Sequence, residues 1–376
     1  MMTSNPQRIT RRRAIGWLGL GASLAWTPAL RGDLEASLAD IQAAPTAAKK
    51  SGLMFPKGSV IRTLLKDVPP ESMGSGPILF HEHLSIDLPP NLNPRPANAP
   101  PPQPSPTLNV DLIVEEVKAA AKDGVTCIVD GGHDDMHRKM ESLREIANRT
   151  GMPIVASGGF YMERTYPPEL ATKSEDQIAD DLAREAAAQR FGAFGEIGEN
   201  SNAAMSDLER KIFRAVGKAH LRTNLPIFTH NAYGTGPDVP RDAGLHQLDV
   251  LESVGVKPAR IVIGHSCCLD DPAAEVIKAI AKRGAFVGFD RVTGGRVVDD
   301  QKIKSLLAFF DAGYADRLVL SSDHTGQRTL DGPAYGRTLT VFVPKLRAAG
   351  VSDDMIHGIL VDNPRRFLAF LPKRTT

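Results

Sequence analysis

The sequence predicts an α/β protein, a (β/α)8 TIM barrel with a short N-terminal β-hairpin, preceded by an export signal. Two observations carry this prediction. From about residue 108 onward, a helical stretch, a Gly or Asn, and a short apolar run follow one another repeatedly. Together with the apolar run at 78–83, these runs extend from Ile78 to Asp323. That span is close to the length of about 250 residues that is typical of such a barrel.

The apolar runs are continuous rather than alternating, which is typical of strands buried on both faces of a parallel sheet. We expect strands at 78–83, 125–130, 152–158, 193–198, 225–230, 260–265, 285–290 and 317–323. Each helical stretch before them ends at a residue type that adopts the left-handed conformation easily. These joints are Gly124, Gly151, Gly192, Asn224, Gly255, Gly284 and Gly313. An open doubly wound sheet is the alternative, but no G-x-G-x-x-G follows the first strand.

The N-terminus differs from the rest of the chain. Three arginines at 11–13 precede an uncharged apolar run at 14–26, which is shorter than the roughly 20 residues of a membrane-spanning helix. We therefore interpret 1–29 as a signal peptide that resembles the twin-arginine type, with a periplasmic or secreted mature protein and no membrane span. Residues 30–57 would be a linker and 58–376 the barrel domain. The segment 58–65 is expected to form the hairpin at the barrel bottom.

Composition narrows the function classes. A net charge of +1 gives no indication of a nucleic-acid partner. Three cysteines are too few and too clustered for a disulfide framework. We expect a small-molecule substrate, and a homodimer is compatible with the sequence.

Polar residues end five of the predicted strands, where catalytic groups of such barrels lie. Each of them alone could be a hydrogen-bonded core residue or a cap. Together, four imidazoles and two carboxylates would meet in one mouth, and without a metal several would be buried unpaired, at about 1–3 kcal/mol each. The pattern therefore predicts a metal centre. The residues are His81, His83, Glu196, His230, His265 and Asp323.

The motifs "HEH" (81–83), "GEIG" (195–198), "FTH" (228–230), "IGHS" (263–266), "SSD" (321–323) and "DNPRRFL" (362–368) resemble, as a set, the phosphotriesterase family of the amidohydrolase superfamily. The resemblance extends from about residue 58 to 371. It implies two divalent metal ions, most often Zn²⁺, with Mn²⁺ or Co²⁺ also suited to these ligands. It assigns His81, His83 and Asp323 to a buried ion, and His230 and His265 to a more exposed one.

The bridge between the two ions would be Glu196, as in the glutamate-bridged branch of the family, where many other members use a carbamylated lysine. Glu199 is the alternative bridge. The resemblance further implies a bridging hydroxide as the nucleophile and Asp323 as the catalytic residue that accepts the proton.

Two departures concern the substrate. Arg291 stands where the organophosphate-hydrolysing members carry a His, and Cys267 and Cys268 follow His265 where they carry an Asp. Because the Arg resembles the lactonase-type members, we expect hydrolysis of a carboxylic ester or lactone, with Arg291 and Tyr161 binding the substrate. Alternatively, Arg291 forms a salt bridge with Asp290 or another neighbour. Tyr161 can equally be packing at the barrel top.

Other functions stay open at this point. They are an organophosphate phosphotriesterase, an amide hydrolase, a mononuclear deaminase-like amidohydrolase and a non-catalytic metal-binding barrel. His133, which follows the second strand, is interpreted as part of a surface turn.

Overall fold

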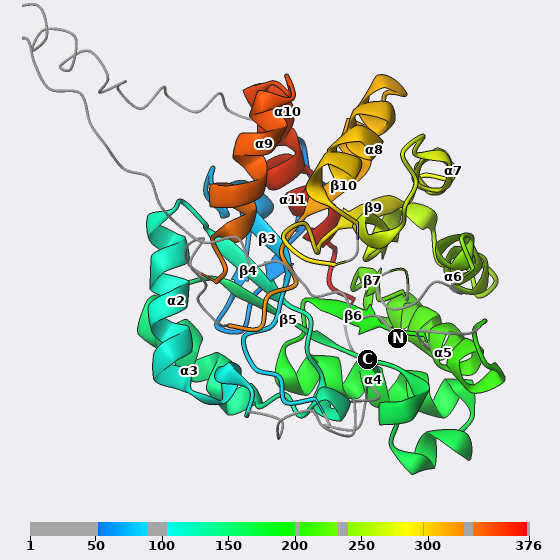
Figure 1. Ribbon diagram of the computed structural model, residues 1–376. Coiled ribbons are helices and arrows are strands. Elements are labelled where there is room, and N and C mark those ends of the chain that lie inside the picture. Colours follow the sequence, from blue (N-terminus) through cyan, green and yellow to red (C-terminus); the bar gives the residue numbers. More distant parts are fainter. Residues whose placement is uncertain are drawn as a thin grey trace, which may run out of the picture. The chain divides into compact units, whose positions relative to one another are not determined.

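Eight parallel strands ringed by helices form the centre of the fold, which Figure 1 shows as a computed structural model. The strands neighbour one another in chain order and every pairing between them is parallel. The predicted (β/α)8 barrel is thereby confirmed. The strands are β3 (Ile78–Glu82), β4 (Cys127–Asp130), β5 (Ile154–Gly158), β6 (Ala193–Ile197), β7 (Ile227–Thr229), β8 (Ile261–Ile263), β9 (Phe286–Phe289) and β10 (Leu318–Leu320).

The structure describes residues 52–88, 104–199, 204–231, 233, 240–295, 297–326 and 334–373. The predicted signal peptide at 1–29 and nearly all of the predicted linker at 30–57 lie outside these ranges. Among the described residues, no helix combines the length and the apolar character needed to cross a membrane.

Helices alternate with the strands and surround them in Figure 1. Side-chain caps begin four of them, because Asn109, Ser174, Ser206 and Ser352 each accept a hydrogen bond from a backbone N–H of the first turn. The helices are α2 (Val110–Lys122), α3 (Met140–Thr150), α4 (Glu175–Gln189), α5 (Asp207–Thr223), α6 (Ala243–Glu252), α7 (Glu275–Lys282), α8 (Asp299–Asp311), α9 (Val343–Ala348), α10 (Asp353–His357) and α11 (Asn363–Leu368).

One predicted joint is wrong. Helix α4 ends at Gln189, and Arg190 directly after it adopts the left-handed conformation with φ 63°, whereas Gly192 does not have a positive φ. Gly192 serves a different purpose, since a Cβ at this position would collide with the carbonyl oxygen of Arg62. The glycine thus permits a close backbone approach rather than a helix end.

The opposite end of the barrel from the strand carboxyl ends is closed by an antiparallel pair and by α11. Strand β1 (Ile61–Arg62) pairs with β2 (Asp67–Val68), and the N–H of Leu64 donates to the carbonyl of Ile154 at the start of β5 (2.8 Å). Phe367 of α11 packs edge-to-face on Phe80 of β3, with ring centroids 5.4 Å apart. An apolar layer therefore fills the barrel interior beneath the strand carboxyl ends.

The barrel closes between its first and last strands, largely through Glu82. The fully buried Glu82 carboxylate accepts hydrogen bonds from Ser321 Oγ (2.7 Å), Ser322 N (2.9 Å) and His324 N (2.7 Å). Two backbone bonds join the same segments, from Asp323 N to His81 O (3.1 Å) and from His83 N to His324 O (2.9 Å). Glu82 lies between the two histidines, but its position in the sequence does not indicate this role.

We predict that Glu82→Ala destabilises the protein strongly. The substitution leaves three donors without an acceptor, two of them on the buried residues Ser321 and Ser322. Each unpaired buried group costs about 1–3 kcal/mol, so the free energy of unfolding should fall by about 2 kcal/mol or more. Urea unfolding measures this change, with the exposed Glu71→Ala as the control variant. A loss as small as that of the control would show that Glu82 does not hold the closure.

His220, near the end of α5, gives the fold a pH dependence. Its Nδ1 donates to the carbonyl of Leu225 (2.6 Å), and burial lowers the pKa of His220 to about 4. Because the unfolded chain binds the proton more tightly, stability is complete above about pH 6.5 and falls as pH drops toward 4.

We predict that His220→Asn, which keeps a donor and removes the titration, flattens this part of the stability curve. The difference between parent and variant should change by about 3 kcal/mol between pH 7 and pH 4, because each pKa unit corresponds to about 1.4 kcal/mol. Urea unfolding at a series of pH values tests this. Parallel curves for the two proteins would contradict it.

Candidate metal centre

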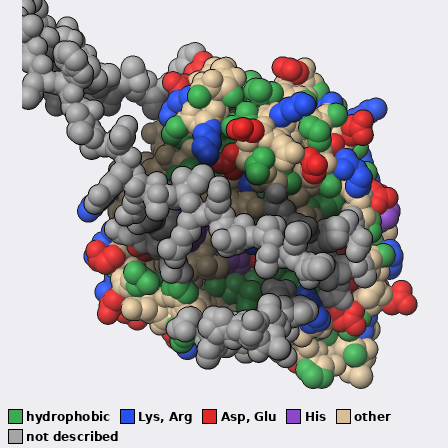
Figure 2. Space-filling model, viewed as in Figure 1, with side chains coloured by type: hydrophobic (Ala, Val, Ile, Leu, Met, Phe, Trp, Pro, Cys, Tyr) green, Lys and Arg blue, Asp and Glu red, His purple; other side chains and the backbone are tan. Residues whose placement is uncertain are grey.

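The six residues predicted as metal ligands come together at the carboxyl ends of the strands. They come from five strands. His81 and Glu196 lie in β3 and β6, and the other four follow the ends of strands: His83 after β3, His230 after β7, His265 after β8 and Asp323 after β10. All are buried except Asp323, whose side chain is 13% exposed. Figure 2 shows the face viewed in Figure 1, with His side chains visible near its centre.

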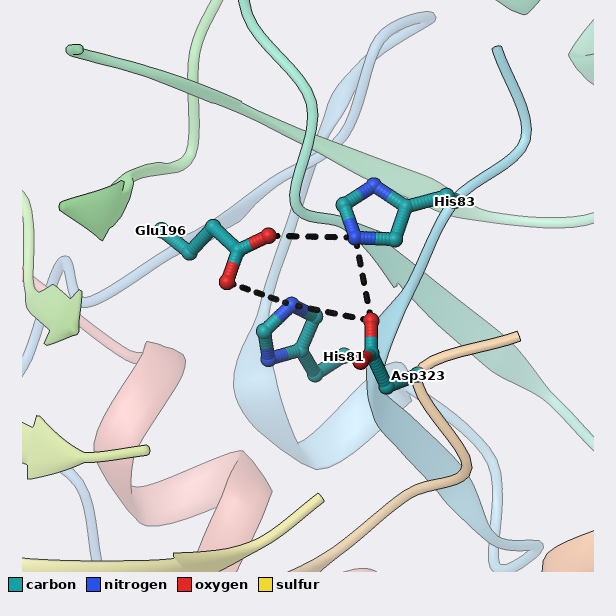
Figure 3. A group of neighbouring side chains, drawn as sticks. All are labelled: His81, His83, Glu196 and Asp323. Carbon is teal, nitrogen blue, oxygen red and sulfur yellow. Dashed lines mark ion pairs between the residues drawn. The ribbon is translucent and has the colours of Figure 1, made fainter. Parts of the chain in front are cut away.

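The deep ligand group consists of His81, His83, Glu196 and Asp323, and Figure 3 shows these side chains pointing toward one another. Nε2 of His83 lies 3.2 Å from Oε1 of Glu196 and 3.1 Å from Oδ1 of Asp323. Nε2 of His81 lies 3.5 Å from Oε2 of Glu196 and 3.8 Å from Oδ1 of Asp323. One ligand atom from each residue lies within 4.8 Å of all the others.

The outer ligand group consists of Glu196, His230 and His265. Oε2 of Glu196 lies 2.8 Å from Nδ1 of His230 and 3.3 Å from Nε2 of His265. Those two nitrogens lie 2.8 Å apart. Glu196 therefore belongs to both groups, while Glu199, the alternative bridge, is buried but belongs to none of the ligand groups found among the described residues.

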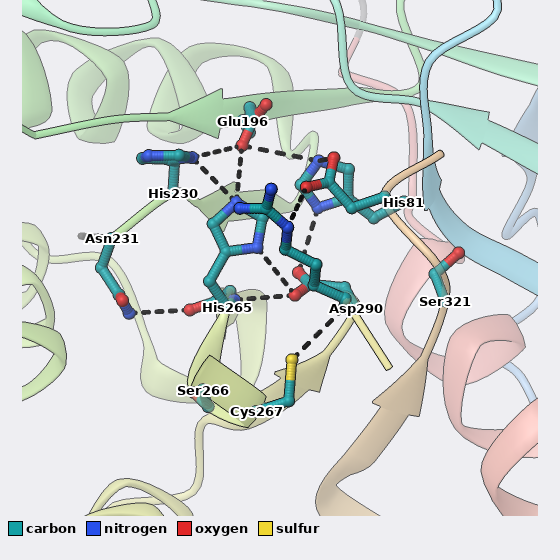
Figure 4. Close-up of polar contacts among 12 residues, drawn as sticks. His81, Glu196, His230, Asn231, His265, Ser266, Cys267, Asp290 and Ser321 are labelled. Atoms are coloured by element: carbon teal, nitrogen blue, oxygen red, sulfur yellow. Dashed lines mark hydrogen bonds and ion pairs between the residues drawn. The ribbon is translucent and has the colours of Figure 1, made fainter. Parts of the chain in front are cut away.

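Asp290, at the end of β9, orients one histidine of each group (Figure 4). Its Oδ2 lies 3.0 Å from Nδ1 of His81, and its Oδ1 lies 3.0 Å from Nδ1 of His265. A carboxylate accepts N–H from both rings, which fixes the proton on Nδ1 and leaves each Nε2 lone pair facing the site. From the sequence, Asp290 was expected only as a partner of Arg291, although it ends its strand as the other site residues do.

The charges of this arrangement call for cations. Three carboxylates, those of Glu196, Asp290 and Asp323, are grouped around the imidazoles. Burial alone would lower the pKa of His83, but its contacts with Asp323 and Glu196 outweigh burial and raise the pKa to about 9. For His265, Asp290 and Glu196 likewise outweigh burial and raise the pKa to about 10. The site thus stabilises positive charge.

The donor set fits divalent metal ions. Nε2 of His81 is buried and has no hydrogen-bond partner, although it points at two carboxylates. Unpaired buried nitrogens are rare in native structures, and a metal ion gives such an atom a partner. Nitrogen and oxygen ligands of this kind suit zinc, manganese or cobalt.

The two predicted substrate-binding residues flank the ligand groups. Nε of Arg291 lies 3.5 Å from Oδ2 of Asp323, so its ion pair is with Asp323 rather than with Asp290. The Tyr161 hydroxyl lies 3.5 Å from Nε2 of His230, and the two rings are 4.7 Å apart. The buried Nζ of Lys302 donates to the carbonyls of Arg291 (3.1 Å), Val292 (3.0 Å) and Gly294 (2.5 Å) and so fixes the segment that carries Arg291.

The interpretation of His133 as part of a surface turn is wrong. His133 is 1% exposed, and its Nε2 lies 2.9 Å from the backbone oxygen of Glu196. A Cβ at Gly131 would lie 2.9 Å from the His81 ring, and one at Gly132 would lie 3.1 Å from the carbonyl oxygen of Ser85, so these glycines allow the segment before His133 to pack closely against the site.

Comparison with known proteins identifies the family. The model of the phosphotriesterase family matches residues 61–368. This chain belongs to the phosphotriesterase family. Membership places it in the amidohydrolase superfamily, as the motifs predicted, and in a family of metal-dependent hydrolases that act on small molecules.

Individual phosphotriesterase-family relatives cover most of the chain. The phosphotriesterase homology protein of Escherichia coli is 31% identical, over 78% of this chain and 98% of its own length. Its crystal structure, which has phosphate in the active site, aligns with a TM-score of 0.67 at 30% identity, over 78% of this chain and 99% of that one. An N-acetyltaurine hydrolase of Xenopus tropicalis is 26% identical (82% and 98% covered), and an aryldialkylphosphatase of Saccharolobus solfataricus is 29% identical (68% and 84% covered).

We predict that Asp290→Asn weakens metal binding by this phosphotriesterase-family chain. An amide can accept from one imidazole only and presents N–H groups to the other, so affinity should fall about 10–100-fold, as is typical when a residue behind a metal ligand is changed. Competition with a chelator measures the affinity. Asp311→Asn, exposed on α8, is the control, and equal affinities in the two variants would refute the orienting role.

Proposed function

We propose that this protein is a binuclear metal-dependent hydrolase that cleaves a carboxylic ester or lactone. One observation carries the binuclear part: the Glu196 carboxylate contacts both groups. Its Oε1 faces His83, and its Oε2 faces His81 of the deep group as well as His230 and His265 of the outer group. A carboxylate shared by two nitrogen-rich groups is suited to hold two cations. In this role His81, His83 and Asp323 would hold the deep ion, and His230 and His265 would hold the outer one, most often Zn²⁺.

Such a pair of divalent ions, when bound, supplies hydroxide at neutral pH and polarises the bond to be cleaved. The protein's own groups would then position the substrate and move the proton. Oδ1 of Asp323 faces His83 and Oδ2 faces Nε of Arg291, and this carboxylate would accept a proton and pass it to the leaving group. Burial alone would raise the pKa of Asp323, but His83 and the other histidines outweigh it, and the lowered pKa keeps the carboxylate ionised until the proton arrives.

Arg291 supports an ester or lactone as the substrate. Its side chain is 37% exposed, so the guanidinium is accessible at the barrel mouth while its Nε faces Oδ2 of Asp323. In this position it can orient an oxygen atom of the substrate next to the group that moves the proton. Tyr161 supplies a hydroxyl next to His230, on the ring nitrogen that faces away from Glu196.

Amide hydrolysis is the second candidate, because several relatives are named N-acetyltaurine hydrolases and the same nucleophile attacks both acyl groups. A phosphotriester is included among the test substrates because the S. solfataricus relative is named aryldialkylphosphatase.

We also propose that the twin-arginine-type sequence at 1–29 directs export, so that the mature protein is periplasmic or secreted.

We predict that the parent binds two metal ions per chain and that Glu196→Ala loses metal and activity together. The loss of activity should exceed the roughly 10–100-fold effect of changing a residue behind a ligand. Plasma mass spectrometry gives the metal content, and turnover is measured on lactones, aryl esters, N-acyl amides and phosphotriesters.

Glu199→Gln is the matched control, because Glu199 is as buried as Glu196 and lies only three residues away. It should keep both ions. One ion in both parent and Glu196→Ala would indicate the mononuclear alternative, and two ions without turnover on any substrate would indicate a binding protein. Highest kcat/KM on amides would favour the second candidate.

A further inference from the structure

The chain segment after β4 lies directly behind Glu196. The N–H of Glu196 donates to the carbonyl of Gly131 (3.1 Å), and Nε2 of His133 lies 2.9 Å from the carbonyl oxygen of Glu196. Both backbone polar groups of Glu196 are therefore bonded to this one segment. The segment also packs on His81, since a Cβ added to Gly131 would lie 2.9 Å from that ring.

Glu196 depends on these bonds because the sheet is irregular around it. The pairing of β5 with β6 ends at Gly158 and Phe194, and the register between β6 and β7 shifts between Phe194 and Ile197. A buried carbonyl outside a regular ladder needs a donor from elsewhere. His133 supplies that donor, so a side chain, rather than a neighbouring strand, holds the backbone from which the Glu196 carboxylate extends.

Asp135 fixes His133 in turn. Its Oδ1 lies 2.9 Å from Nδ1 of His133, and both side chains are almost completely buried. Its Oδ2 accepts hydrogen bonds from the backbone N–H of Tyr161 (2.8 Å) and from Thr165 Oγ1 (2.7 Å). Asp135 therefore sets the orientation of the imidazole and attaches it to the loop after β5.

The loop after β5 also contacts the outer ligand group directly. The ring of Tyr161 packs edge-to-face on the ring of His230, with an interplanar angle of 72°. His133 thus reaches Glu196, and Asp135 reaches His230 through Tyr161. Two of the three residues of the outer group are held by the same buried pair.

We propose that His133 and Asp135 are a positioning pair that sets the affinity of the outer ligand group for its metal ion. The inference rests on the proposed binuclear function. Neither residue lies in a ligand group itself. They act by holding the Glu196 backbone and the Tyr161 loop in the geometry that the outer ion requires, and a looser geometry weakens that ion before the deep one.

The test is stepwise titration of the metal-free full chain with Co²⁺ in competition with a chromophoric chelator, which gives one dissociation constant for each ion. Thermal unfolding of each metal-free protein is measured in parallel. The variants are His133→Leu, which removes both hydrogen bonds, His133→Gln, which can restore a donor toward Glu196, and Asp135→Asn. The control is His137→Asn, which changes an exposed residue of the same segment whose left-handed backbone conformation Asn tolerates.

We expect His133→Leu and Asp135→Asn to weaken the outer ion about 10–100-fold and the deep ion much less, in keeping with residues that orient metal ligands. His133→Gln should lie between His133→Leu and the parent, and His137→Asn should equal the parent. The Co²⁺ absorption bands of the outer ion should change most in His133→Leu and Asp135→Asn, and should not change in His137→Asn.

Unchanged dissociation constants in folded His133→Leu or Asp135→Asn overturn the positioning role. Equal weakening of both ions together with a lower unfolding temperature of the metal-free protein also overturns it, because that pattern reflects general destabilisation. If His133→Leu does not fold, Asp135→Asn and His133→Gln decide the question by the same criteria. A parent chain that binds fewer than two ions refutes the proposed function itself, a result that is evident before any variant is compared.

Discussion

The contact between β3 and the segment after β10 is the constraint on which the rest of the structure depends. Glu82 accepts from Ser321, 239 residues away in the chain, and the backbone bonds beside it bring His81 and His83 next to Asp323. Without this closure the strands would form an open sheet, and the deep group would be divided between its two edges. Metal binding and barrel closure are therefore two consequences of the same set of contacts.

Electrostatics explains why so many polar groups can be buried here. A single buried carboxylate or imidazole is unfavourable, but the carboxylates of this site are each shared between several imidazoles. Asp290 illustrates the principle, because burial alone would raise its pKa, yet His265 and His81 outweigh burial and hold the pKa well below its usual range. Its negative charge in turn keeps the two rings oriented toward the position of a cation.

The sequence was most informative where residues repeat at equivalent positions. The apolar runs and the polar residues at their ends predicted the barrel and brought the six candidate ligands to one mouth, because parallel strands end at the same face. It was least informative where a role depends on a tertiary partner. Glu82 and His133 are single polar residues with partners on other strands, and their positions in the sequence do not indicate those partners. Asp290 ends its strand as the ligands do, but its two histidine partners come from other strands. The predicted end of α4 was wrong for a related reason, because Gly192 is required by the close approach of the Arg62 backbone and not by the end of the helix.

The order of ligands along the chain has a consequence for biosynthesis. The deep group takes its first two ligands from the first barrel strand and its last ligand from the end of the eighth. A growing chain therefore cannot bring this group of residues together until nearly all of the barrel has left the ribosome. A metal ion held by this group would accordingly bind only when folding is nearly complete. A chain that ends before residue 321 would lack both the donors that close the barrel on Glu82 and the last ligand of the group.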